Sequence, residues 1–63
     1  MDIMNQESEA VLVRLSFDEI SALNNALNES LEHLDEWEFQ TRMGVTQAQV
    51  RTLLECFGQI KYQ

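Results

Sequence analysis

The sequence has 63 residues, of which 11 are acidic and four are lysine or arginine, and its formal net charge is −7. A chain of this length forms one small domain that buries only about 60% of its unfolded surface, so its stability is marginal. With one cysteine and one histidine, a disulfide framework and a structural metal site are excluded, and we expect no cofactor. Oligomerisation or a partner protein is the remaining source of added stability.

The longest apolar run covers only residues 10–13, which is too short for a signal peptide or a membrane span. A lone cysteine, Cys56, suits a reducing compartment. We therefore expect a cytoplasmic protein with no membrane partner.

The N-terminal segment, residues 1–9, is polar and acidic without periodicity, and we expect a mobile tail followed by a single helical domain over residues 10–63. Residues 10–15 predict one short strand, in which Val11, Val13 and Leu15 alternate with Leu12 and Arg14. No second strand of similar quality follows. The strand should pair outside its own chain, begin the helix or stay partly extended, and pairing with a second copy would give a homodimer.

The longest periodic segment, residues 15–34, predicts an amphipathic helix. Ser16 and Glu19 have the spacing of a capping box at its start. Its apolar arc contains Phe17, Ile20, Leu23, Leu27, Leu31 and Leu34. The opposite side contains Asp18, Asn25, Glu29, Glu32 and Glu36.

Two shorter helices are expected after this one. Asp35 and Glu38 repeat the capping spacing, and Gly44 ends the second helix. Thr46 and Gln49 repeat the spacing once more, before a third helix over residues 47–58. The predicted fold is mainly α, with a short N-terminal strand followed by a small three-helix domain. Cys56, on the flank of the third helix, is expected to be buried or half-buried.

Residues 39–54, FQTRMGVTQAQVRTLL, resemble the helix-turn-helix of DNA-binding repressors, with a glycine in the turn followed by an apolar residue and a cap. This resemblance implies a regulator that reads DNA as a dimer through Gln47, Gln49 and Arg51. Gln40 departs from the pattern, because the family prefers a small residue there. A chain of net charge −7 is poorly equipped for phosphate contacts, which argues against nucleic-acid binding.

No catalytic constellation is visible, and we expect no enzymatic activity. Asp35, Glu36 and Glu38 fit a helix N-terminus better than an acid–base pair. His33 could share a weak, open metal site with Glu29 and Glu36, but a solvated polar face is the preferred interpretation.

Acidity and one aromatic residue point to protein binding. Trp37, between two glutamates, is either a half-buried edge or an exposed anchor for a partner. An acidic helix attracts basic proteins and speeds their encounter. The residues predicted to bind such a partner are Asp18, Glu29, Glu32, Glu36 and Trp37.

The segment LSFDEISALNNALNE, followed by EWEFQTRMGVT, is similar to small bacterial proteins that include immunity proteins of polymorphic-toxin and contact-dependent inhibition systems. The resemblance implies a cytoplasmic inhibitor that binds and occludes a cognate toxin domain. It carries over no binding residue, because the matching positions are mostly caps and core. The alternatives are the helix-turn-helix regulator and a purely structural dimerisation unit.

Overall fold

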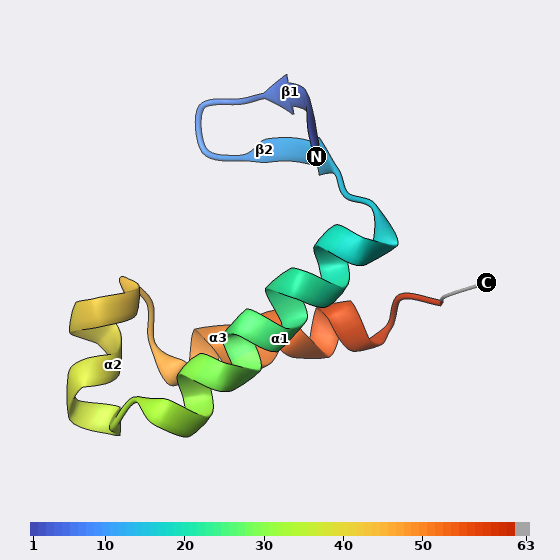
Figure 1. The fold of residues 1–63 in the computed structure, drawn as a ribbon. Coiled ribbons are helices and arrows are strands. Elements are labelled where there is room, and N and C mark those ends of the chain that lie inside the picture. Colours follow the sequence, from blue (N-terminus) through green and yellow to red (C-terminus); the bar gives the residue numbers. More distant parts are fainter. Residues whose placement is uncertain (62–63) are drawn as a thin grey trace.

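The computed structural model describes residues 1–61, which form a two-stranded hairpin followed by three helices (Figure 1). The elements are β1 Asp2–Gln6, β2 Val11–Arg14, α1 Phe17–His33, α2 Glu36–Met43 and α3 Gln47–Gly58. The predicted fold class, a short N-terminal strand before a small three-helix domain, is confirmed. The structure contains one strand more than expected, β1, which precedes the predicted strand.

The additional strand corrects the prediction for residues 1–9. Within this segment, β1 pairs antiparallel with β2, placing Ile3 opposite Val13 and Asn5 opposite Leu12, with an irregularity at Met4 between them. The N–H of Glu7 donates to the carbonyl of Ala10 over 2.7 Å and closes the turn. A mobile tail and a strand without a partner in its own chain were therefore wrong expectations for β1 and β2. The irregularity interrupts the alternation that identifies a strand in a sequence.

Helix α1 begins as predicted. The N–H of Glu19 donates to Ser16 Oγ over 3.1 Å, and the N–H of Ser16 donates to Glu19 Oε1 over 2.9 Å. This reciprocal capping box satisfies two N–H groups that lack partners in the helix itself.

The turn between α2 and α3 also follows the sequence prediction. Gly44 has the left-handed backbone conformation, with φ of 79°, and its N–H donates to the carbonyl of Gln40 over 2.9 Å. Thr46 and Gln49 form the expected capping box of α3.

The predicted cap of α2 is only partly correct. Asp35 is the N-cap residue, but its side chain accepts no capping hydrogen bond. The carboxylate of Glu38 instead accepts from Arg42 Nε over 3.1 Å. Arg42, one turn further along α2, thus binds the Glu38 carboxylate, which in a capping box would accept from the N–H of Asp35.

The core is small. α3 packs against both α1 and α2, and the buried apolar side chains of the described chain are Ile20, Phe39 and Val50, one from each helix. Leu23 and Leu53 were expected on the buried faces of their helices but are exposed. Cys56 is exposed as well, which corrects the expectation of a buried or half-buried thiol. Three short helices that meet around one point cannot cover their whole apolar faces.

The hairpin stands apart from the helices (Figure 1). The molecule is accordingly wide for its length: its radius of gyration is 13.1 Å, whereas a compact domain of this length has about 11 Å. No helix among the described residues has the length and apolar character needed to cross a membrane.

Candidate functional site

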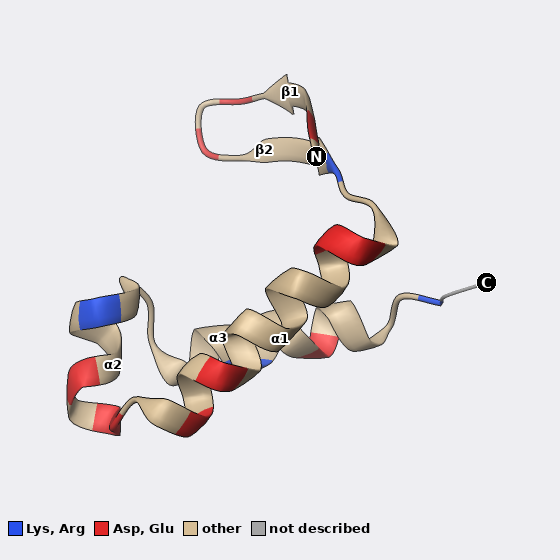
Figure 2. Ribbon diagram, in the orientation of Figure 1, with Lys and Arg blue, Asp and Glu red and all other residues tan. Residues whose placement is uncertain are grey.

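The end of α1 and the start of α2 form an acidic corner, which we define as Glu29, Glu32, His33, Glu36 and Trp37. All five side chains are exposed. Figure 2 shows acidic residues on both sides of the short connection between these helices. The connection comprises the C-cap residue Leu34 and the N-cap residue Asp35, so two residues separate the acidic end of α1 from the acidic start of α2.

Trp37 is the most exposed large apolar side chain in the described chain, at 81% of its full accessibility. Phe39, two residues further along α2, is 1% exposed. Positions two apart on a helix point to nearly opposite sides, so when Phe39 enters the core Trp37 must point to solvent. The structure thus decides between the two predicted environments of Trp37 in favour of the exposed one.

The carboxylate of Glu29 has a close partner within the corner. His33 Nε2 lies 2.9 Å from Glu29 Oε2, one helical turn away. Glu32 and Glu36 form no ion pair within residues 1–61. These two carboxylates therefore dominate the field that a partner meets at the corner.

Three side chains that could hold a metal ion lie together at the same corner, but the set differs from the predicted one. One ligand atom each from Glu29, Glu32 and His33 lie within 4.8 Å of one another, and all three residues are exposed. The sequence prediction joined Glu36 to Glu29 and His33. Because α1 ends at His33, Glu36 belongs to the next helix, and Glu32 takes its place.

Asp18, the remaining predicted partner-binding residue, lies in the first turn of α1. Glu29 is eleven positions further along α1, which is about 16 Å along a helix axis. The predicted acidic face therefore consists of two separate areas, and the corner is the one that contains the most exposed aromatic side chain of the described residues, Trp37.

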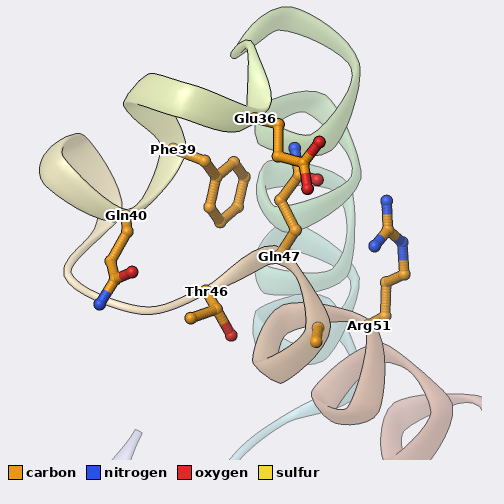
Figure 3. Close-up of a pocket in the computed structure, with 7 residues that line it drawn as sticks. Glu36, Phe39, Gln40, Thr46, Gln47 and Arg51 are labelled. Atoms are coloured by element: carbon orange, nitrogen blue, oxygen red, sulfur yellow. The ribbon is translucent and has the colours of Figure 1, made fainter.

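A groove lies between α2 and α3 (Figure 3). It has a volume of about 340 Å³ and is lined by Glu36, Phe39, Gln40, Thr46, Gln47, Ala48 and Arg51. In Figure 3 the ring of Phe39 points from α2 toward α3, while polar side chains surround it. Gln40 was the position at which the sequence departs from the helix-turn-helix pattern, and a long side chain there lines the groove instead of allowing close helix contact.

The residues predicted to read DNA are divided between two roles. Gln47 and Arg51 line the groove. Gln49 caps α3: its Oε1 accepts from the N–H of Thr46 over 2.8 Å and from Thr46 Oγ1 over 3.2 Å. A side chain held in a capping box is not available to a base edge without losing those bonds. The sequence did not indicate that Glu36 and Gln40 line a groove, apart from the departure of Gln40 from the helix-turn-helix pattern.

Glu19, near the start of α1, has an altered acidity. The terminal ammonium of Met1 forms an ion pair with the carboxylate of Glu19. This hydrogen bond, together with that from the Ser16 backbone, lowers the pKa of Glu19 from 4.5 to about 2. The pair links the hairpin to α1 and lies away from the acidic corner.

No protein-family model matches the chain, and no curated protein or solved structure matches it significantly.

Proposed function

We propose that this chain is a non-enzymatic protein-binding module whose acidic corner engages a basic partner protein, with Trp37 as the anchor. The observation that carries the proposal is the 81% exposure of Trp37, which directly follows Glu36 at the start of α2. Tryptophan is enriched among interface residues whose truncation costs about 2 kcal/mol or more of binding free energy.

The fold has no need for a tryptophan at this position. The core contact of α2 is made by Phe39, which is fully buried, so Trp37 adds nothing to the packing of α2 against α3. A partner that covered the ring would remove a large apolar surface from water and gain the corresponding free energy. A binding role accounts for this residue better than a role in folding.

The charge of the corner favours a basic partner. Glu32 and Glu36 are exposed and form no ion pair within residues 1–61, so a lysine- or arginine-rich surface would gain attraction and lose little on desolvation at the exposed rim. The net charge of −7 adds long-range steering in the same direction. Binding of this kind is sensitive to ionic strength.

In its most specific form, the proposal is an immunity-type inhibitor that occludes a basic toxin domain. The support for this form is the resemblance of residues 15–29 and 36–46 to such bacterial proteins, together with the acidic corner. A helix-turn-helix regulator has weaker support, because Gln49 is committed to capping and the groove offers one cation, Arg51, beside Glu36.

The test is affinity capture from a lysate of the native host with three baits: the wild type, Trp37→Ala and Leu12→Ala. Leu12 is a second large, exposed apolar residue, located in the hairpin, and serves as the matched control. We expect one basic protein to bind stoichiometrically to the wild type and to Leu12→Ala, and to be lost with Trp37→Ala. Equal recovery on all three baits, or recovery of a specific DNA instead, would contradict the proposal.

The inhibitor form requires a second result. Expressed alone, the captured protein should arrest growth of its host cell, and co-expression of the wild type but not of Trp37→Ala should restore it. A captured protein without such an effect would be consistent with a protein-binding module but would contradict the inhibitor form of the proposal.

A further inference from the structure

Four polar side chains line the groove between α2 and α3 without a partner in the described chain. Glu36 and Gln40 reach the groove from α2, and Gln47 and Arg51 reach it from α3 (Figure 3). Within residues 1–61 neither charged group forms an ion pair, and neither side-chain amide forms a hydrogen bond. The groove therefore offers one anion, one cation and two amide groups to a ligand.

The other side chains of the lining contribute little to recognition. Thr46 Oγ1 donates to Gln49 Oε1 over 3.2 Å and accepts from the N–H of Gln49 over 3.1 Å, so it is engaged in the cap of α3. Phe39 is 1% exposed, so its ring supports the groove but offers almost no surface to a ligand. The groove selects by charge and hydrogen bonding more than by apolar contact.

Arg51 places a cation next to the acidic corner. Glu36 belongs both to the corner and to the groove, so the two surfaces are continuous at this residue. A partner that was basic throughout would be attracted by Glu36 and repelled by Arg51, and juxtaposed like charges oppose binding. A ligand with a basic group for Glu36 and a carboxylate for Arg51 satisfies both charges.

The size and the amides of the groove favour a short peptide segment. Its volume of about 340 Å³ lies near the lower end of the range of ligand pockets, about 300–1,000 Å³. The amides of Gln40 and Gln47 both donate and accept, so they match the N–H and C=O groups of a peptide backbone. In an extended segment alternate side chains lie on one side, about 7 Å apart. A phosphate group would suit Arg51 but would be repelled by Glu36.

We propose that the groove binds an extended peptide segment that presents a lysine or arginine to Glu36 and, two residues away, an aspartate or glutamate to Arg51. The assignment of this segment to the basic partner rests on the proposed function, and the segment would extend that contact from the acidic corner into the groove. Arg51 lies outside the corner, so its contribution is measured with the corner intact.

The experiment is an NMR titration of the isotope-labelled full chain with two blocked tripeptides, acetyl-Lys-Ala-Glu-amide and acetyl-Lys-Ala-Lys-amide. The readout is the backbone amide shifts of Gln47, Ala48 and Arg51. The first peptide has no net charge, and the second carries two positive charges. Because the net charge of −7 favours the second peptide, a preference for the first identifies a local cation as its cause.

Arg51→Gln and Arg14→Gln form a matched pair of variants. Each removes one exposed arginine that has no ion pair within residues 1–61, but Arg14 lies in β2 and not in the groove. We expect the wild type and Arg14→Gln to prefer acetyl-Lys-Ala-Glu-amide, and Arg51→Gln to bind this peptide about fivefold more weakly and to lose the preference. Far-UV circular dichroism checks that both variants remain folded.

Three results would overturn the proposal: tighter binding of the doubly basic peptide by the wild type, no saturable shift change with either peptide, or equal effects of the two arginine substitutions. Failure of the proposed function is observed separately, in the capture on the Trp37→Ala bait. A partner that depends on Trp37, together with tripeptides that do not bind, would reject the groove and retain the corner. The reverse pair of results would retain the groove as a peptide site and reject the corner.

Discussion

Gly44 is the described residue whose backbone requires glycine. At φ of 79°, a side chain would be strained by contact with its own backbone, at a cost of about 1–2 kcal/mol. A Cβ atom at this position would meet nothing within 4 Å, so the cost is purely conformational. Gly44→Ala should lower the free energy of unfolding, measured in urea, by about 1 kcal/mol.

Gly58 provides the control for that substitution. It ends α3 without a positive φ, and a Cβ atom there would also meet nothing within 4 Å. Gly58→Ala should therefore leave the free energy of unfolding unchanged or raise it slightly. Equal destabilisation by both substitutions would show that the left-handed turn does not control the α2–α3 connection.

Glu19 makes stability depend on pH. Its pKa is about 2 in the folded chain, against an ordinary value of 4.5, so the unfolded state takes up a proton first as pH falls. The stabilising contribution is complete above about pH 4.5 and is lost progressively toward pH 2. The urea midpoint of the wild type should fall in this window relative to that of Glu19→Gln, which lacks the titrating group. If the urea midpoints of the two proteins changed in parallel with pH, the ion pair between Glu19 and the terminal ammonium would be excluded.

At the level of elements, the caps of the helices differ in strength. Ser16 and Thr46 accept capping hydrogen bonds, whereas the side chain of Asp35 does not. Ser16→Ala and Thr46→Ala should each reduce the free energy of unfolding by about 1 kcal/mol. Asp35→Ala should cost less, because it removes only a charge near the helix N-terminus. Thermal or urea denaturation of the three variants decides whether the capping bonds are formed.

Helix boundaries could be predicted from the sequence because their causes are local. Each depends on a few neighbouring residues, such as Ser16 with Glu19 or Gly44 after Met43. The hairpin could not be predicted in the same way, because β1 acquires its conformation only through pairing with β2. Its one irregularity, at Met4, removes the alternation that would have revealed it.

At the level of the whole molecule, stability depends on very few side chains. Phe39 and Val50 are the fully buried ones in the described chain, and a domain of this length is stable by only about 3–9 kcal/mol. Phe39→Ala should cost about 3–5 kcal/mol and unfold much of the population, seen as loss of helical circular dichroism at 25 °C. Trp37→Ala should leave that signal unchanged, because its side chain packs against nothing in the core. If the Phe39→Ala protein remained folded, stability would not depend on the side chain of Phe39 as expected.

The acidic corner was partly predictable. Glu29 and Glu32 lie at the end of α1, and Glu36 and Trp37 lie at the start of α2, and the caps alone predict these positions. The exposure of Trp37 could not be predicted, because it depends on which side of α2 meets α3. The engagement of Gln49 in a cap, by contrast, was predicted from its spacing to Thr46, and the separation of Asp18 from Glu29 follows from their positions along one helix.

The most direct test of the acidic corner is the association rate constant with the captured basic partner at low and moderate salt. Glu32→Lys/Glu36→Lys reverses two charges at the corner, and Glu7→Lys/Glu9→Lys makes the same change in the hairpin turn. We expect the corner variant to associate at least about tenfold more slowly and with a weaker salt dependence, and the turn variant to lose much less. Equal rates for the two variants would contradict the acidic corner as the binding surface.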